Sequence, residues 1–452
     1  MNQAKNRELF EEMPVARAVR TMAIPTIIGQ LIVLIYNMAD TFFIGRTNNP
    51  FMVAGASLIL PVFNISLSVA SIAGVGGGSM ISRLLGEQRN EEAKKVSSFC
   101  IWFSAAMAVL FSALTLIFMR PLLELLGAGT ETYGFAKSYA LCVIVAGGLP
   151  TIMTNVLSNL VRSVGESKKA GFGVTLGGLI NIALDPLFMF VILPDGKEIL
   201  GAGIATCLSN CISCLYFVFV MKRLSKTSAL RFSSPKILPE KSSISQIFSI
   251  GIPTAIATLL FDVDYIVIDK LMSAYNDIAL AAVGIVLKAE RLPLNIGIGI
   301  CQGMVPIVAY NFASKNYSRM KAVSRFSLIL GVVCAVVSIT LYEIFAPYIM
   351  RFFIADSETV ALGTDFLRIR CLATVFMFMS FYHVHLFNSY GKGGKALFLG
   401  VTRWAVFNIP MLFIMNAIVG MYGIVWSQLI ADIFTVILSM AVHHKYTKEN
   451  FQ

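Results

Sequence analysis

The feature that most constrains the fold of this chain is the recurrence of apolar runs about as long as a lipid bilayer is thick. A helix needs about 20 residues to cross a bilayer, and such runs recur along all 452 residues with no stretch of soluble composition between them. Only 13% of the residues are charged, against about 25% in an ordinary soluble domain. We therefore predict an all-α integral membrane protein with about twelve transmembrane helices.

The basic residues are distributed unevenly among the segments that connect the expected spans. Of 36 Lys and Arg residues, 25 fall in the two tails and alternate loops, five fall in the other loops, and the rest lie in or beside spans. Because cytoplasmic segments carry an excess of Lys and Arg, we expect both termini to be cytoplasmic in a multi-pass protein of the cell (plasma or inner) membrane. The net charge of +11 then needs no nucleic-acid partner.

The second half of the sequence repeats motifs of the first half in the same order. The tripeptide Ile-Pro-Thr at 24–26 recurs at 252–254, and Gly-Ile at 203–204 recurs at 423–424. Each repeat holds an even number of expected helices, so both halves have the same orientation in the membrane. We predict two six-helix lobes related by pseudo-two-fold symmetry, with Pro25 bending the first helix.

A polar segment between the repeats sets the expected domain boundaries. Residues 222–244 contain six basic residues and two prolines, a composition that interrupts helical periodicity. We expect an amino-terminal lobe at 1–221, a cytoplasmic linker at 222–244 and a carboxy-terminal lobe at 245–452. Two lobes of like orientation around a midplane cavity can rock against each other to give alternating access.

Two acids lie within expected spans of the amino-terminal lobe, where an ionised side chain is costly and usually functional. Asp40 and Asp185 lie about 30 Å and about 24 Å of helix rise from the cytoplasmic ends of their helices. Asn181 is one turn before Asp185, and Thr206 reaches a similar depth. Such a group suits a hard cation or a proton. The alternative is that each acid only pairs with a polar neighbour or lies near the headgroups.

The repeat places this group in one lobe only. Alignment of the two halves sets Ile268 opposite Asp40 and Leu412 opposite Asp185. An apolar side chain can neither hold a cation nor take up a proton. We therefore expect a single, one-sided coupling site.

Charged residues also occur in the seventh and eighth expected spans. They are Asp262, Asp264 and Asp269 in the seventh span and Lys288, Glu290 and Arg291 in the eighth. Two interpretations stay open. The residues form a buried ion-pair network across the hairpin of these spans, or Asp262 or Asp264 binds a cationic substrate directly in the cavity.

Over essentially its whole length, the sequence resembles the multidrug and toxic compound extrusion (MATE) family. The motifs that carry the resemblance are Met-Ala-Asp-Thr-Phe-Phe-Ile-Gly at 38–45, Ile-Ser-Arg-Leu-Leu-Gly at 81–86, Asn-Ile-Ala-Leu-Asp-Pro at 181–186 and Gly-Ala-Gly-Ile-Ala-Thr at 201–206. The combination is specific, whereas no single motif is.

The resemblance implies secondary active export of small, mostly cationic amphipathic drugs or toxins in exchange for H⁺ or Na⁺. It assigns Asp40, Asn181, Asp185 and Thr206 to a coupling site in the amino-terminal lobe. The other branch of the family uses an acid on helix 7 and an Asp on helix 10, and the tenth span here has no Asp in its core. We therefore expect the amino-lobe branch, no cofactor, no metal other than Na⁺, and a monomer.

Two alternatives belong to other functional classes. A lipid-linked sugar flippase would need a cationic cavity for pyrophosphate, whereas the cavity residues identifiable in the sequence include several acids. A membrane-embedded enzyme such as a prenyltransferase would need an Asp-rich metal motif, and Asp262-Val263-Asp264 is too short to supply one. We expect a transporter and not an enzyme.

Overall fold

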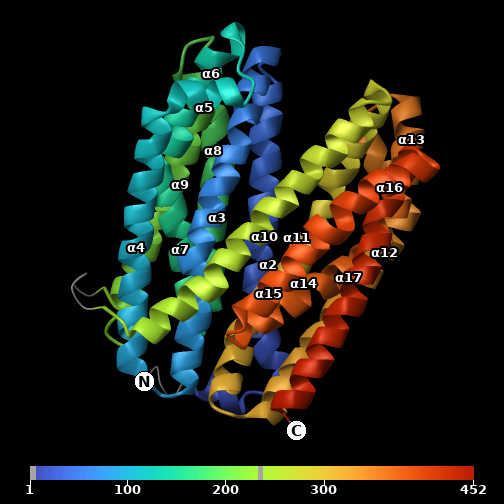
Figure 1. Cartoon of the computed structure of the whole chain (residues 1–452). Coiled ribbons are helices and arrows are strands. Elements are labelled where there is room, and N and C mark those ends of the chain that lie inside the picture. The colour runs from blue at the N-terminus through green and yellow to red at the C-terminus, as the bar shows by residue number, and fades with distance from the viewer. Residues whose placement is uncertain (1–6, 233–237, 452) are drawn as a thin grey trace.

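The computed structural model describes residues 7–232 and 238–451. In this part of the chain nearly every residue is helical and none is in a β-strand, so the predicted all-α fold is confirmed. The helices form two bundles, one from each half of the chain. The bundles converge at the end that holds both termini and diverge toward the other end (Figure 1).

The first bundle contains the helices of the amino-terminal half. They are the π-helical segment η1 (Glu8–Glu12), α2 (Val15–Gly45), α3 (Pro50–Gly86), α4 (Asn90–Ile117), α5 (Met119–Leu125), α6 (Thr130–Ala140), η2 (Leu141–Ala146), α7 (Gly148–Ser163), α8 (Ser167–Leu187), η3 (Phe188–Ile192) and α9 (Glu198–Leu224). The start of α3 shows why such boundaries form. Asn49 accepts hydrogen bonds from the first backbone amides, and Pro50 occupies the position where a missing N–H costs nothing.

The second bundle contains the helices of the carboxy-terminal half. They are α10 (Lys241–Ser273), α11 (Asp277–Ala313), α12 (Tyr317–Phe353), α13 (Ser357–Cys371), α14 (Thr374–Ser389), α15 (Gly393–Val401), η4 (Thr402–Asn408), α16 (Ile409–Val419) and α17 (Met421–Asn450). Asn276 and Asp356 cap α11 and α13 through their side chains. Gly420, with φ of 74°, makes the turn between α16 and α17.

The number of membrane spans differs slightly from the expected number. By length and composition, ten helices in the described ranges could cross a membrane, and the bent pair Thr130–Ala146 and Gly148–Ser163 makes up to eleven. The sequence predicts one span at 358–387, but the structure divides this segment into α13 and α14, and α13 carries Arg368 and Arg370 in its last turn. Each of these helices is shorter than the spans, so length and composition support fewer than the expected twelve.

The bent pair has an identifiable cause. Its two parts meet at an angle of 47°, where the π-helical segment η2 is followed by Gly147 and Gly148. Glycine pairs and π-helical turns are common sites of helix kinks. The bend separates the part that carries Tyr139 from the part that carries the polar residues between Thr151 and Arg162.

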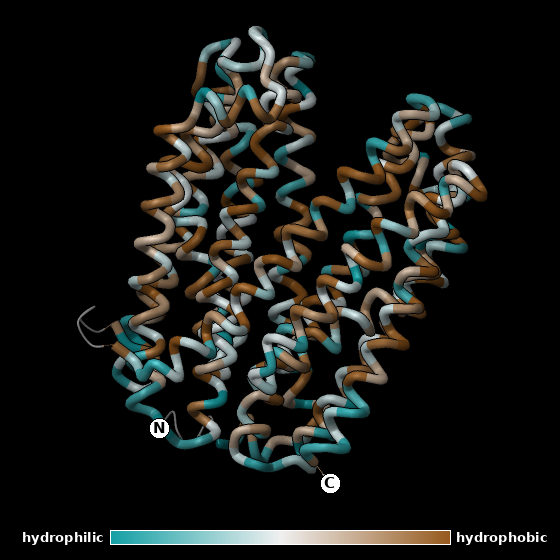
Figure 2. Tube along the Cα trace, viewed as in Figure 1, coloured by the Kyte–Doolittle hydropathy of each residue, from teal (hydrophilic) through white to brown (hydrophobic). Residues whose placement is uncertain are grey.

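Hydropathy follows the long axes of the bundles. Apolar residues cover the lengths of the helices, and hydrophilic residues gather in the connections at the ends (Figure 2). Many large apolar side chains are exposed on the outer faces, among them Leu215, Phe352 and Ile418. A multi-pass membrane protein shows this distribution, because lipid covers those faces.

The two bundles contact each other most extensively through α3 with α10 and α2 with α11, and α3 also packs on α11. Glycine permits the crossing of α3 and α10. A Cβ atom on Gly76 would clash with the carbonyl of Ile247, and one on Gly251 would clash with the carbonyl of Ile72. Small residues allow membrane helices to approach this closely.

The amino-terminal segment crosses from one bundle to the other. Arg319 of α12 donates hydrogen bonds to the carbonyls of Leu9, Phe10 and Met13, at 3.3, 2.5 and 2.6 Å. The Phe10 ring is fully buried and stacks on Tyr310 of α11. Residues 8–13 therefore pack on the second bundle, although the sequence-based boundary assigned residues 1–221 to the first.

The connection between the bundles is shorter than the expected linker. Because α9 continues to Leu224 and α10 begins at Lys241, both ends of the 222–244 segment are helical. Five residues of that expected linker, 233–237, lie outside the described residues. At the start of α10, the Glu240 amide and the Ser243 hydroxyl donate to Glu92 of α4.

Candidate functional site

A polar cavity of about 230 Å³ lies within the first bundle, between α2, α3, α7, α8 and α9. Six carboxamide side chains line it: Gln30, Asn155, Asn159, Asn181, Asn210 and Gln302. Gln302 comes from α11 of the second bundle and accepts a hydrogen bond from Gln30 at 3.1 Å. The cavity therefore reaches the contact between the bundles.

Three of the four expected coupling residues form one hydrogen-bonded group. The Asn181 amide nitrogen donates to Asp185 Oδ1 at 3.3 Å and to Thr206 Oγ1 at 3.2 Å. Asp185 is fully buried, and its second carboxylate oxygen has no partner in the described part of the chain. Because Asn181 and Thr206 also line the cavity, the Asp185 carboxylate lies directly behind its wall.

Asp40, the fourth expected residue, has a separate hydrogen-bond partner. The Tyr139 hydroxyl donates to Asp40 Oδ2 at 3.0 Å, and Asp40 Oδ1 is buried with no partner among the described residues. The charges of Asp40 and Asp185 lie close enough to interact, and Tyr36 lies within range of both. The two acids therefore share one electrostatic environment, although no hydrogen bond joins Asp40 to the Asp185 group in the described residues.

Tyr139 and Tyr36 were not identified from the sequence. Tyr139 lies about as far inside the outer end of its expected span as Thr206 does in its own. The depth argument applied to Asp40 would therefore have found Tyr139. Tyr36 lies one turn before Asp40 on α2.

The helices that carry Asp40 and Asp185 are held together near Pro25. The Thr26 hydroxyl donates to the Met22 carbonyl at 2.9 Å and lies 3.1 Å from the hydroxyl of Ser167 at the start of α8. The Pro25 carbonyl fills the space that a side chain at Gly171 would need. α2 continues as one helix through Pro25, and the expected bend there stays a prediction.

The second bundle also buries acids, but these form ion pairs with arginines. Glu290 of α11 pairs with Arg370 of α13 at 2.8 Å, and both side chains are buried. Asp432 of α17 accepts two hydrogen bonds from Arg403 of η4, at 2.8 and 3.2 Å. Gln428 donates to the same carboxylate at 2.6 Å. Each of these charges is therefore compensated inside the bundle.

The expected ion-pair network across the hairpin of α10 and α11 is present only in part. Glu290 pairs with α13, and Lys288 is exposed, because its side chain lies on the opposite face of α11 from the bundle interior. Arg291 lies over the Tyr265 ring at 5.1 Å and within electrostatic range of the half-buried Asp262.

Asp264 lies among the charges of the two ion pairs. It is fully buried, and neither of its carboxylate oxygens has a hydrogen-bond partner in the described ranges. Its nearest charges include those of Arg370, Arg403 and Glu290. Asp264 does not line the amide-rich cavity of the first bundle.

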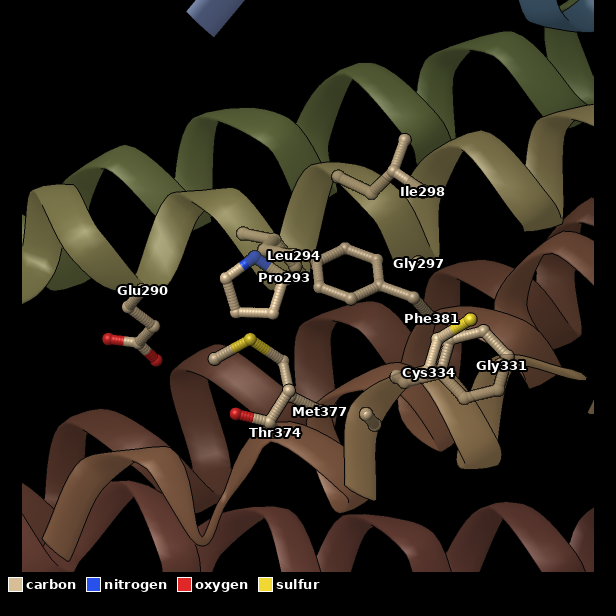
Figure 3. Close-up of a pocket in the computed structure, with 12 residues that line it drawn as sticks. Glu290, Pro293, Leu294, Gly297, Ile298, Gly331, Cys334, Thr374, Met377 and Phe381 are labelled. Carbon is tan, nitrogen blue, oxygen red and sulfur yellow. The ribbon is translucent and has the colours of Figure 1, made fainter. Parts of the chain in front are cut away.

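The space beside Glu290 is small. A pocket of about 10 Å³ lies between α11, α12 and α14, with Glu290 and Thr374 at one end and Phe381 and Gly331 at the other (Figure 3). This volume holds about one water molecule. The pocket therefore has no room for a drug-sized ligand in this conformation.

The positions that correspond to the two amino-lobe acids are apolar and packed together. Ile268 and Leu412 are fully buried in one hydrophobic cluster of the second bundle, with Ile424 and Phe366. The structure thus offers no polar counterpart to the Asp40 and Asp185 site at these positions.

Comparison with known proteins finds one family. The family model MatE matches residues 25–187 and 253–414, which correspond to the two repeats. The multidrug export protein MepA of Staphylococcus haemolyticus (strain JCSC1435) is 30% identical over 433 residues, covering 96% of this chain and 94% of that protein. MepA of Staphylococcus aureus (strain MSSA476) is 30% identical over 434 residues with the same coverage.

Solved structures show the same fold at lower sequence identity. An outward-facing multidrug resistance MATE family transporter of the MOP superfamily superposes with a TM-score of 0.92, 20% identity and coverage of 98% of both chains. A MOP superfamily transporter from Pyrococcus furiosus Vc1, described as having a binding pocket of reverse polarity, gives a TM-score of 0.88 and 21% identity over 97% of both chains.

Proposed function

The chain belongs to the MATE family of transporters, and we propose that it is an antiporter that exports small, mostly cationic amphipathic drugs or toxins in exchange for H⁺ or Na⁺. The observation that carries this proposal is the fully buried Asp185 carboxylate, which lies behind the wall of a polar cavity and has no basic partner among the described residues. The names of the MepA relatives support multidrug export.

The coupling step follows from the cost of a buried charge. A carboxylate without a basic partner is expensive in a poorly solvated site, and a second carboxylate nearby adds repulsion. A proton or Na⁺ between Asp40 and Asp185 removes that cost, with Asn181 and Thr206 supplying neutral oxygens. Loading and unloading therefore change the local charge, which shifts the equilibrium between two arrangements of the lobe.

Alternating access requires the bundles to exchange their contacts. With both termini cytoplasmic, as the distribution of Lys and Arg favours, the bundles meet on the cytoplasmic side and diverge toward the outside (Figure 1). This arrangement is the one that releases substrate outward. The contact between Gln30 and Gln302 links the cavity to the interface that must open on the other side.

The orientation can be tested with single cysteines. Lys226 lies in the connection between α9 and α10, and Asp195 lies in the connection between η3 and α9. In a variant without the native cysteines, Lys226→Cys should react only with reagent inside the cell and Asp195→Cys with impermeant reagent outside. Labelling of position 226 in intact cells would contradict cytoplasmic termini in the cell membrane.

The rival functions are less well supported by the site. A lipid-linked sugar flippase would need several basic groups for a pyrophosphate, and the lining of the cavity contains a single charged side chain, Arg162. For a membrane-embedded enzyme, Asp264 would have to take part in a metal site, yet it is surrounded by the Arg370 and Arg403 ion pairs.

The proposal is tested by measuring transport in lipid vesicles. The vesicles contain this protein alone, as a monomer at low density in the membrane. Efflux of a fluorescent cation is measured first with a sodium gradient and then with a pH gradient. At least one of the two gradients should drive efflux by the wild-type protein. Neither gradient should drive efflux by Asp40→Asn. Asp365→Asn is the matched control, because Asp365 also accepts a hydrogen bond from a tyrosine, Tyr422, but is exposed.

Absence of efflux under both gradients would contradict the proposed antiport. Wild-type efflux by Asp40→Asn at every pH and sodium concentration would contradict the assignment of the coupling site. Equal losses in Asp40→Asn and Asp365→Asn would indicate a general effect of the substitutions and not a coupling role.

A further inference from the structure

The segments that lead into α2 and α10 pack on opposite bundles. Residues 8–13, the first strap, precede α2 but lie against α11 and α12 of the second bundle. Residues 238–243, the second strap, lead into α10 but lie against α4 of the first bundle. Both contacts lie at the end of the molecule where the bundles converge and where the chain has its termini (Figure 1). At that end, each bundle is therefore held by a segment from the other half of the chain.

The first strap is fixed by side chains of α11 and α12. Arg319 donates to three of its backbone carbonyls, and the Asn311 amide donates to the Phe10 carbonyl at 3.0 Å. The Tyr310 hydroxyl donates to Glu11 Oε1 at 2.7 Å. Because the Phe10 ring is also fully buried there, departure of the strap would expose an aromatic ring and break all of these hydrogen bonds.

The second strap is fixed by one buried acid. The Glu240 amide and the Ser243 hydroxyl donate to Glu92 Oε1 at 2.7 and 2.9 Å. Glu92 lies in the first turn of α4, and 6% of its surface is exposed. A carboxylate at this place satisfies donors at the start of α10 that have no partner within their own helix. Separation of α10 from α4 would leave the buried acid without these donors.

The two residues that hold the straps occupy equivalent positions in the repeat. Glu92 and Arg319 are 227 residues apart, as are the first residues of the repeated Val-Ser motif at 96–97 and 323–324. The acid accepts from donors at the start of a helix, and the arginine donates to carbonyls at the end of a helical turn. The repeat thus keeps the position of the contact while its chemistry is reversed.

Opening at this end would separate the first strap from the residue that holds it. Only Met13 and Pro14 lie between η1 and α2, and two residues span at most about 7 Å. The start of α2 is in turn fixed to the first bundle, because the Ser167 hydroxyl donates to the Met22 carbonyl at 2.6 Å. If the bundles part by more than this short connection allows, the first strap must leave Arg319.

We propose that the two straps form a latch, with Arg319 and Glu92 as its holding residues, that stabilises the arrangement open to the outside. The inference rests on the alternating access of the proposed function and adds the contacts that set the ratio of the two arrangements. The latch acts in one arrangement only, because its hydrogen bonds cross between the bundles and are lost once the ends part. Weakening either strap therefore raises the fraction of molecules whose bundles are parted at this end.

The latch is tested by the rate at which a buried thiol at the contact between the bundles reacts. The Ser79 hydroxyl donates to the Asn388 carbonyl of the other bundle at 2.6 Å, and 1% of the Ser79 surface is exposed. In a variant without the native cysteines, Ser79→Cys should react with a water-soluble maleimide only when the bundles part at this end. The purified protein is held in lipid nanodiscs, so that the reagent reaches both faces.

Substitution of the arginine should have the larger effect on this rate. Arg319→Gln should raise the labelling rate about tenfold or more, because three hydrogen bonds from a charged group to the first strap are lost. Arg319→Lys should reverse part of the increase, since it keeps the charge but not the fork of N–H donors. Arg325→Gln is the control and should leave the rate unchanged, because Arg325 is an exposed arginine of the same helix.

Substitution of the acid tests the second strap. Glu92→Ala should raise the labelling rate about fivefold or more, because both hydrogen bonds to the start of α10 are lost. Glu91→Ala is the matched control, because Glu91 lies in the same turn but is exposed and pairs with Lys94. The double variant of Arg319→Gln and Glu92→Ala should show about the product of the single effects, since the two straps have no contact residue in common.

An unchanged or undetectable labelling rate in both Arg319→Gln and Glu92→Ala would overturn the latch. An equal increase at Cys100, tested as the only cysteine, would also overturn it, because Cys100 is fully buried against Gly77 within the first bundle and reports loosening of the fold. If Arg319→Gln does not accumulate, Arg319→Lys and Glu92→Ala still decide. Labelling needs no ion gradient, so failure of gradient-driven efflux would contradict antiport and leave this comparison valid.

Discussion

The two bundles compensate several of their buried acids differently, although Asp264 of the second bundle also has no hydrogen-bond partner among the described residues. In the second bundle Glu290 and Asp432 are buried, and each lies 2.8 Å from an arginine. In the first bundle Asp185 is buried just as deeply, yet its hydrogen-bond partner is the neutral Asn181. The comparison teaches that burial alone does not identify a functional carboxylate in a membrane protein. The absence of a basic partner is the more informative observation.

A duplicated asparagine makes the contrast sharper. The repeat sets Asn408 opposite Asn181. Asn408 donates to Gln428, which donates to the Asp432 carboxylate that Arg403 neutralises. Asn181 instead donates to an acid with no arginine and lines a cavity of about 230 Å³. The same residue thus belongs to a closed ionic network in one bundle and to an open site in the other.

The largest effect on efflux should come from removing Asp185, the buried acid that has no arginine partner among the described residues. Asp185→Asn should reduce gradient-driven efflux to the level of protein-free vesicles, because the site can no longer change its charge. The protein should remain folded, since the amide is nearly the same shape and no ion pair is broken. Vesicle efflux and thermal unfolding of the purified protein measure the two parts. Unfolding of Asp185→Asn would show that the acid has a structural role like that of Glu290.

The next largest effect concerns the acids that pair with arginines. Here a substitution should lower the stability of the protein instead of abolishing coupling. Arg370→Met leaves Glu290 buried without its partner, which should cost about 3–5 kcal/mol of stability. Thermal unfolding and the amount of protein in the membrane measure this loss. Adding Glu290→Leu should restore most of it, because apolar pairs of similar volume often replace buried ion pairs without loss. If the single variant is as stable as the wild type, the ion pair is not the reason that these charges are tolerated.

An intermediate effect on efflux is expected when a substitution removes a ligand of the coupling site without removing a charge. Asn181→Ala removes the contacts to Asp185 and Thr206 and should reduce coupled efflux about tenfold, the value of one hydrogen bond to a charged group. Asn408→Ala is the matched variant in the second bundle and should leave coupling at the wild-type rate. A smaller effect of Asn181→Ala than of Asn408→Ala would remove the proposed difference between the two asparagines.

The smallest effect should come from an acid that is paired but exposed. Glu240 accepts a hydrogen bond from Arg89 at the start of α10, and this bond lowers the pKa of the Glu240 carboxyl below its ordinary value. Its contribution is therefore present above the ordinary Glu pKa and is lost as pH falls through the lowered value. Glu240→Gln should change the thermal midpoint very little at neutral pH, because exposed pairs are weak. A loss as large as that of Arg370→Met would contradict the distinction by burial.

The sequence alone determined the class of fold and the positions of the amino-lobe acids along their helices. Apolar length and helix rise are local properties, so the spans and the depth of Asp40 and Asp185 could be estimated without tertiary structure. The spacing of Asn181 and Asp185 predicted their shared helix face, and the structure shows the hydrogen bond between them. The break in the segment at 358–387 was missed, because no proline or glycine lies between α13 and α14 to mark it.

Tertiary structure alone decided which charges meet. Arg370 is 80 residues from Glu290, and Arg403 is 29 residues from Asp432. Their pairing depends on the rotation of separate helices about their own axes, which sequence periodicity constrains weakly when a membrane helix is apolar on all sides. For the same reason Lys288 was grouped with acids that it does not contact, and Arg162 was not expected in the cavity. The depth of a residue in the membrane follows from its position along its helix, whereas the direction of its side chain depends on what packs around that helix.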